Sequence, residues 1–226
     1  MDRGSRGKAA AAKQAIVRAT TDLLQDHGFE SLKVKDVVEA SGVARSLFYY
    51  HFDSLDAVVD YMISDFVEGF AATLLNLFPE VPLVACDYDG LRQMEEQHVA
   101  VFSYVYERRD QYQALSRDLG IAPSFLQRLR QRTVEAYEQC DFLFVDGRGR
   151  TCMLARRESE YYIESLAGHH LGVIDCWAKR RFAESPEELH RMEMVLDRLL
   201  PEPTISLKQR YASYEVSHIA SWKDFA

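Results

Sequence analysis

The chain has 226 residues, of which 47% are hydrophobic and 27% are charged, a composition typical of a globular protein in water. Its formal net charge is −8, yet residues 1–18 contain five basic side chains and one acidic side chain. A basic end on an acidic body is the pattern expected where only one end of a molecule meets phosphate.

Composition also excludes several classes of protein. Eleven glycines, six prolines and few short alternating runs of Val, Ile and Thr argue against a β-sandwich or barrel. The basic start is not followed by an apolar segment, so no signal peptide is predicted, and no apolar run approaches the roughly 18 residues of a membrane-spanning helix. No C-x-x-C pair occurs, which favours free thiols in a reducing cytoplasm over a zinc or redox site for Cys86, Cys140, Cys152 and Cys176. We expect a cytoplasmic protein without membrane contact, metal or cofactor.

The first predicted helix runs from about Lys8 to His27, because small and aliphatic residues recur along it at three- and four-residue spacing. Gly28 follows and is placed for a left-handed helix C-cap. A second short helix is expected over about 34–40 and a third over about 45–52. The inward stripe of the first helix consists of Ala12, Ile16, Ala19, Thr20, Leu23 and Leu24.

The three short helices and the turn at residues 40–42 fit a helix-turn-helix unit. The turn requires Gly42 because the backbone there must adopt a left-handed or otherwise strained conformation. The third helix then exposes side chains that suit DNA: Arg reads guanine edges, Ser and Tyr hydroxyls bond phosphate or base, and Tyr rings pack on thymine methyl groups or sugars. These side chains belong to Arg45, Ser46, Tyr49, Tyr50 and His51.

The rest of the chain predicts further helices. Ser54 is placed to cap a long fourth helix over about 55–77, and Pro123 and Pro186 suit first-turn positions. Loops are expected at 79–89 and 146–150, and residues 201–226 form an extension whose Ile219 and neighbouring aromatic residues can pack back as a short helix. The remaining predicted helices cover about 90–108, 110–118, 123–142, 153–181 and 186–200. The predicted fold is all-α, with a three-helix DNA-binding domain at 1–53, a helical-bundle domain at 54–200 and the extension.

Three stretches carry a family resemblance that extends from residue 16 to residue 60. Residues 23–29 (LLQDHGF), 34–43 (VKDVVEASGV) and 48–52 (FYYHF) resemble the DNA-binding domain of the TetR/AcrR family of bacterial transcriptional regulators. The resemblance covers about a quarter of the chain. It implies a regulator that binds operator DNA as a dimer, with repression as the default and activation left open.

By position, the resemblance implies contacts to phosphates and bases from Tyr49, Tyr50 and His51. It places Arg45 and Ser46 in the major groove, and it places Lys33 and Lys35 near the DNA backbone. Two departures stand out: the family commonly has a phosphate-binding Lys where this chain has Leu55, and small hydroxyl residues where it has Ala44 and Leu47. Lys8, Lys13 and the N-terminal arm are expected to compensate for the missing phosphate contacts.

For the second domain, the resemblance implies a small-molecule cavity among helices rich in aromatic residues, which would take a mostly apolar or aromatic effector. The polar residues expected to line it are His98, Tyr104, Tyr137, Tyr161 and His169. Dimerisation is expected through the helices at about 153–181 and 186–200, which carry apolar stripes at helical spacing. The stripes consist of Leu166, His170, Val173 and Trp177, and of Leu189, Met192, Leu196 and Leu199.

Other interpretations remain open for many of these residues. His51 can be a helix-end cap, Tyr49 can be partly core, and Lys33 and Lys35 can be solvated charges. Any one of the aromatic residues in the second domain can be plain core. His169 and His170 form a satisfied pair more often than a metal site, since adjacent helical residues point about 100° apart. No catalytic motif is present, so an enzyme is not expected; the alternative function is a helical adaptor or co-activator that binds a protein partner.

Overall fold

The computed structural model describes residues 3–77, 99–139, 143–145, 151–154, 156–199 and 219–220. Its backbone forms two compact units, one of residues 1–68 and 108–129 and the other of residues 69–107 and 130–226. The unit boundaries fall inside two long helices, α4 (Leu55–Leu77) and α7 (Ala122–Tyr137). The domain division at residue 53 remains a prediction.

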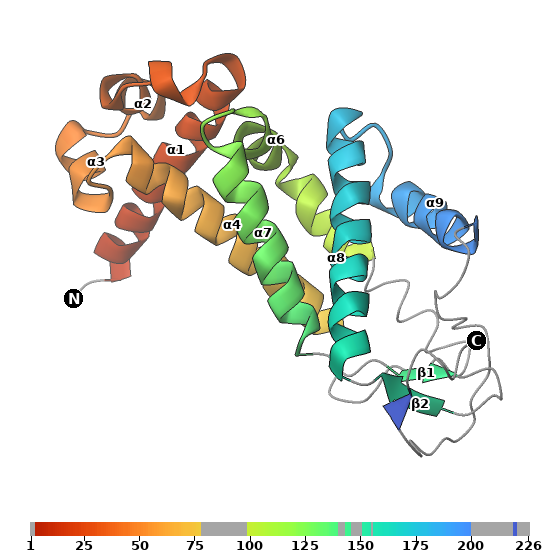
Figure 1. Ribbon diagram of the computed structural model, residues 1–226. Coiled ribbons are helices and arrows are strands. Elements are labelled where there is room, and N and C mark those ends of the chain that lie inside the picture. Colours follow the sequence, from red (N-terminus) through yellow and green to blue (C-terminus); the bar gives the residue numbers. More distant parts are fainter. Residues whose placement is uncertain are drawn as a thin grey trace. The chain divides into compact units, whose positions relative to one another are not determined.

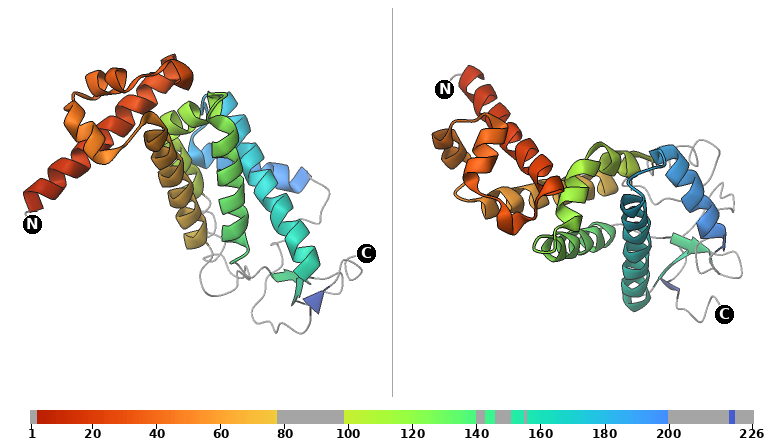
Figure 2. Two further views of the ribbon diagram at one scale, coloured as in Figure 1. Left: turned by 60° about the vertical axis from the view of Figure 1, so that its left-hand side comes forward. Right: turned by 90° about the horizontal axis from the view of Figure 1, so that it is seen from above.

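The first unit begins with α1 (Arg3–Asp26), a 3-10 turn (Phe29–Ser31), α2 (Val34–Ser41) and α3 (Arg45–His51). α2 and α3 pack against α1 (Figures 1 and 2). The first part of α4, together with α6 (Arg109–Arg117) and the start of α7, completes the unit. The helix boundaries predicted for residues 34–77 are thus confirmed to within one residue.

The core of the first unit is formed by the stripe predicted on α1 and by apolar residues of the later helices. Ile16 and Phe48 are completely buried. Phe66 of α4, Tyr112 of α6 and Phe125 of α7 form a buried aromatic cluster with ring centroids 5.5–5.8 Å apart. Edge-to-face ring contacts at these separations add to the stabilisation that apolar burial supplies.

The second unit contains the later parts of α4 and α7, helical residues 99–107, α8 (Arg156–Lys179) and α9 (Pro186–Leu199). Trp177 of α8 is its central side chain: the indole stacks on Tyr106 with centroids 5.7 Å apart and meets Phe102 and Phe182 edge-on. These contacts confirm the plain-core interpretation for Phe102 and Trp177, both of which are almost completely buried.

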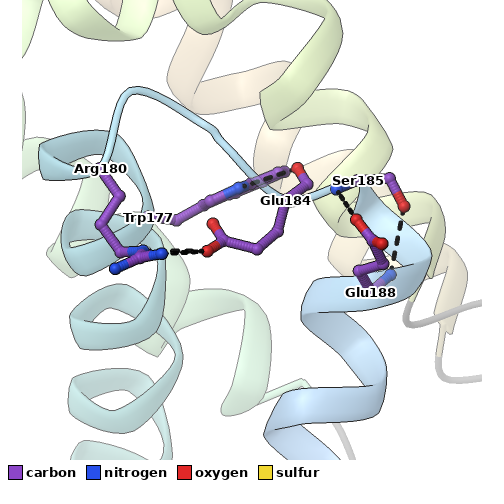
Figure 3. A network of polar contacts seen from close by, with 5 residues as sticks. All are labelled: Trp177, Arg180, Glu184, Ser185 and Glu188. Carbon is purple, nitrogen blue, oxygen red and sulfur yellow. Dashed lines mark hydrogen bonds and ion pairs between the residues drawn. The ribbon is translucent and has the colours of Figure 1, made fainter.

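A short turn joins α8 to α9 and is held by side chains from both of its ends (Figure 3). The Trp177 Nε1–H donates to the Glu184 carbonyl at 3.2 Å, and the Arg180 guanidinium donates twice to the Glu184 carboxylate at 2.7 and 2.9 Å. Ser185 and Glu188 exchange hydrogen bonds at the start of α9, a capping box that satisfies two otherwise unpaired backbone N–H groups. Pro186 occupies the first helical position, as predicted.

A small sheet is the main departure from the all-helical expectation. β1 (Leu143–Val145) pairs antiparallel with β2 (Thr151–Leu154), which pairs parallel with β3 (Ile219–Ala220). The helices predicted to end at 142 and to begin at 153 therefore stop short at Tyr137 and start late at Arg156. Short apolar runs on either side of a Gly-rich loop are a hairpin signal. The helix predicted to include Ile219 is also wrong, because Ile219 lies in β3. The all-α class is confirmed, since the described elements outside this small sheet are helices.

Two further expectations are settled by the backbone. Gly42 has φ 65° and ψ 12°, so the left-handed turn predicted between α2 and α3 is confirmed. Gly28 has φ −68° and ψ 147°, which is extended, so the left-handed cap predicted there is wrong. Among the described helices, none combines the length and apolar character needed to cross a membrane.

Candidate nucleic-acid interface

The candidate interface is built on α3, and the turn before it determines how α3 leaves α2. Gly42 donates its N–H to the Glu39 carbonyl at 3.3 Å while in the left-handed conformation, which ends α2 abruptly. At the other end of α2, the Asp36 carboxylate accepts from the Lys33 N–H at 2.9 Å. Each end of α2 is thus closed by its own residues, which is why the local sequence was sufficient to predict it.

The buried face of α3 holds the helix against the core. Phe48 is completely buried and Phe52 is 5% exposed, and their rings lie 6.2 Å apart. Leu55, which follows at the start of α4, is 9% exposed and belongs to the same core. An ammonium group at this position would be buried among apolar side chains, so the absence of the family's usual Lys agrees with the packing.

The opposite face of α3 points outward. Tyr50 is 74% exposed and Tyr49 is 44% exposed, and Arg45 and Ser46 are exposed as well. The Arg45 guanidinium lies 5.7 Å from the centroid of the Tyr49 ring, so the two side chains share one patch. Tyr49 also meets Phe48 edge-on at 5.4 Å, which agrees with the interpretation that its ring is partly core. We name the exposed side chains of Arg45, Ser46, Tyr49 and Tyr50 the α3 face.

His51 lies at the edge of the α3 face. Its ring is half-buried and meets Tyr50 edge-on at 5.0 Å. Its Nε2 is buried and has no hydrogen-bond partner among the residues that the structure describes. A buried polar atom in this state calls for a structural or functional reason; the role of His51 as cap or DNA contact stays a prediction.

The lysines divide into two groups. Lys33 and Lys35 are exposed at the start of α2. Lys13 instead places its Nζ 3.5 Å from the centroid of the Tyr61 ring and 5.6 Å from that of Phe52, a cation–π arrangement that joins α1 to α4. Lys8 is a residue of α1, but its side chain lies outside the described set.

Tyr61 shows the electrostatics of this junction. Burial raises the pKa of its hydroxyl above the ordinary value, and the charge of Asp65 and a hydrogen bond to that carboxylate at 3.4 Å act in the same direction. The ring therefore stays neutral and presents its face to the Lys13 ammonium. Sequence reasoning gave Lys13 a possible phosphate contact and missed this intramolecular partner, because Tyr61 is 48 residues away.

The predicted effector-site residues lie in different surroundings. The Tyr104 ring rests against Gly69 and meets Phe70 at 6.3 Å. Tyr137 is 1% exposed, and its hydroxyl lies 2.5 Å from the Nδ1 of His170. Tyr161 is 72% exposed, and His98 lies outside the described residues. All five assignments remain predictions.

A buried carboxylate at the α8–α9 contact was not anticipated. Glu193 is 2% exposed, and its oxygens lie 3.5 Å from the Nε2 of His170, 3.7 Å from that of His169 and 4.0 Å from the Nδ1 of His190. Both adjacent histidines thus lie within 4 Å of one carboxylate oxygen, a contact that the sequence did not predict. One sequence signal was available: Glu193 lies four residues after the apolar Leu189, so both fall on the same face of α9. In the described ranges, no group of three or more ligating side chains is arranged to hold a metal ion.

The stripes predicted for the dimer need correction. Trp177 is 1% exposed and Leu189 is 5% exposed, so both belong to the interior of their own chain. Helical periodicity identifies an apolar face but not the surface that covers it. Met192, at 47% exposure, does point outward. Dimerisation through α8 and α9 stays a prediction, without Trp177 and Leu189 as contact residues; the side chains of Leu196 and Leu199 lie outside the described set.

Comparisons with known proteins bear on the interface directly. Residues 16–62, which include α2, α3 and the start of α4, match the sequence model of a family described as bacterial regulatory proteins, tetR family. A search of curated protein sequences found no significant match.

Solved structures share the fold along most of the chain. A TerR/AcrR-family transcriptional regulator from Aquifex aeolicus VF5 has a TM-score of 0.57 at 13% identity, with 84% of this chain and 99% of that chain covered. A TetR transcriptional regulator from Streptococcus agalactiae 2603V has a TM-score of 0.51 at 19% identity, with coverages of 85% and 96%. NalD, the secondary repressor of the MexAB-OprM multidrug efflux pump in Pseudomonas aeruginosa, has a TM-score of 0.52 at 17% identity, with coverages of 83% and 95%.

Proposed function

We propose that the chain, whose residues 16–62 match the tetR family of bacterial regulatory proteins, binds palindromic operator DNA as a dimer and is released by a small effector. The family match places it with DNA-binding regulators of transcription and not with enzymes. A regulator of this kind works where the DNA is, in the cytoplasm.

The outward direction of the α3 face is the observation that carries the proposal. Tyr50 is 74% exposed and Tyr49 is 44% exposed, while Phe48 of the same helix is completely buried. A seven-residue helix with two exposed tyrosines is costly in solubility unless the rings meet a partner. A helix presented in this way fits the major groove, where arginine and hydroxyl groups read base edges and phosphates.

Dimerisation gives this helix its specificity. Two copies of α3 held about one DNA turn apart read the two halves of a palindrome. Exposed Met192 on α9 and half-buried Leu166 and Val173 on α8 support an interface on these helices. The shared surface would be isologous, as in most two-fold dimers.

An effector would act by favouring the conformer whose two α3 helices are wrongly spaced, so that operator affinity falls by the differential binding energy. The aromatic side chains of Phe70 and Tyr104 in the second unit support a mostly apolar or aromatic effector. The description of NalD as a repressor supports repression as the sign of control.

The test begins with selection of duplexes from a random library by the full-length protein, followed by titration of the best duplex at several salt concentrations. We expect a palindromic consensus and an affinity that falls by about 0.9 log unit per log unit of salt for each phosphate contacted. Weak binding that is insensitive to salt would instead favour the adaptor or co-activator, which uses the same fold for a protein partner.

A pair of variants at exposed side chains localises the binding. Tyr50→Ala removes a ring that is 74% exposed on α3, and Leu126→Ala removes an apolar side chain that is 40% exposed on α7. We expect the first to weaken operator binding about tenfold, since a good base or phosphate contact contributes roughly 1–3 kcal/mol. The second should leave it unchanged. Equal effects from both variants would refute the assignment of the α3 face.

A further inference from the structure

One carboxylate organises the corner between α6 and α7. Asp118 follows the last residue of α6, and its Oδ1 accepts from the N–H groups of Gly120 at 2.9 Å and Ile121 at 3.1 Å. Its carbonyl accepts from the N–H of Ala122 at 2.8 Å, where α7 begins. An aspartate that bonds the backbone two and three residues ahead forms an Asx-turn, which shapes this corner locally.

The second oxygen of the same carboxylate leaves the corner. Asp118 Oδ2 accepts from the Phe29 N–H at 2.7 Å, across 89 residues of sequence. Phe29 begins the 3-10 turn that joins α1 to α2, and both residues belong to the first compact unit. A carboxylate that bonds a backbone N–H in a partly buried site makes a charge-assisted hydrogen bond, which is short and strong.

The backbone of the turn agrees with this contact. Gly28 is extended instead of left-handed, so the chain leaves α1 in a direction that presents the next N–H to Asp118. A Cβ on Gly28 would lie 3.8 Å from Asp118 Oδ2, so the carboxylate also packs directly over this residue. α1 and α6 lie side by side along the same contact.

We propose that Asp118 is a positioning residue for DNA binding, which fixes the turn leading into α2 to the corner between α6 and α7. The inference rests on the proposed function. Through this bond, the position of the α6–α7 corner determines the direction of α2 and hence that of the α3 face. Neither the family match, which ends at residue 62, nor the α3 face includes this residue.

The test uses the full-length protein and the selected operator duplex. Asp118→Asn keeps the size of the side chain and one acceptor oxygen, which can serve the Asx-turn or Phe29 but not both. Asp118→Ala removes both contacts. Asp110→Asn is the matched control: it removes the same charge from the exposed first turn of α6, in the same unit.

Three quantities are measured for each variant: amide hydrogen exchange of residues 28–33 and 119–122, the unfolding midpoint, and affinity for operator and for random DNA. For Asp118→Asn we expect exchange at Phe29 to rise about tenfold, since loss of a charge-assisted bond shifts a local equilibrium by at least that factor. Operator affinity should fall by about fivefold or more while random-DNA affinity stays close to wild type. The unfolding midpoint should also fall, since a bond lost from the native state lowers global stability as well. Asp110→Asn should behave as wild type.

Two results overturn the inference. Unchanged exchange at Phe29 in both Asp118 variants means that the bond does not hold this turn in solution. Increased exchange with unchanged operator affinity means that the bond does not position α3. If the wild-type chain selects no duplex at all, the proposed function fails, and the positioning role fails with it. If the wild-type chain binds an operator and the Asp118 variants bind it equally well, only the positioning role fails.

Discussion

The helix-turn-helix at residues 29–52 and the α8–α9 region at 156–199 are both helical, but they depend on different kinds of interaction. In the first, α2 and α3 are ended by their own residues, with Gly42 in the left-handed conformation and Asp36 bonded to Lys33. In the second, the central side chain is Trp177, whose ring partners Phe102 and Tyr106 are more than 70 residues away. Local signals therefore predict the first region, while the second depends on long-range packing.

The largest effect should come from dividing α3 into its two faces. Phe48→Ala removes a completely buried ring and should lower the free energy of unfolding by about 3–5 kcal/mol. Tyr50→Ala, two residues further along α3, removes a ring that is 74% exposed and should change the free energy of unfolding by less than about 0.5 kcal/mol. Urea denaturation followed by circular dichroism measures both. If both variants lose a similar free energy of unfolding, α3 has no outward face. The helix-turn-helix would then depend on packing on all sides, as the α8–α9 region does.

These contrasts explain what the sequence could predict. The α3 face follows from a helix that must bury Phe48, because helical geometry then turns Tyr50 outward. The same rule failed for Trp177 and Leu189, where it identified an apolar face and assigned it to a second subunit, although the chain covers that face itself. The buried Glu193 and the Lys13–Tyr61 contact were missed because each depends on a partner from another helix. Periodicity reports which side of a helix is buried, and only the fold reports against what.

Two helical glycines, Gly69 and Gly172, differ in the space around them and test how tightly the second unit is packed. A Cβ on Gly69 of α4 would collide with the Tyr104 hydroxyl and lie 2.9 Å from its Cζ, whereas one on Gly172 of α8 would meet nothing within 4 Å. Gly69→Ala should therefore destabilise the protein by about 1–3 kcal/mol through overpacking. Gly172→Ala should stabilise it by about 0.5–1 kcal/mol, as is usual for a helix interior.

The rescue experiment identifies the cause. Tyr104→Phe removes the hydroxyl that the new methyl group would strike, so the Gly69→Ala/Tyr104→Phe double variant should recover part of the lost stability in thermal unfolding. If the double variant is no more stable than the sum of the single changes, the collision is not the reason that position 69 is glycine.

The turn between α8 and α9 offers a smaller, stabilising change. Arg181 and Phe182 both have left-handed backbones, with φ 59° and 54°, although neither is glycine. Arg181 is exposed, so Arg181→Gly should relieve backbone strain and raise the free energy of unfolding by about 0.5–1 kcal/mol. Phe182→Gly relieves the same strain but loses a buried ring that packs on Trp177 at 4.9 Å, and it should be destabilising. Opposite signs in chemical denaturation would show that long-range packing maintains the strained turn.

The smallest effect concerns acid sensitivity at the same turn. The hydrogen bonds from Arg180 lower the pKa of the Glu184 carboxyl below its ordinary value. A lowered pKa in the folded state means that the stabilisation is present above the unfolded value of about 4.3 and is lost as the pH falls through the folded value. Glu184→Gln and Arg180→Ala should each remove this part of the pH dependence, measured as urea midpoints between about pH 6 and pH 3. Because Arg180 is exposed, solvent screens the pair and the effect stays small. A Glu184→Gln variant whose midpoint still follows the wild-type curve below pH ~4.3 would place the acid-sensitive carboxyl elsewhere, and the turn would then depend on Trp177 and Phe182 packing alone.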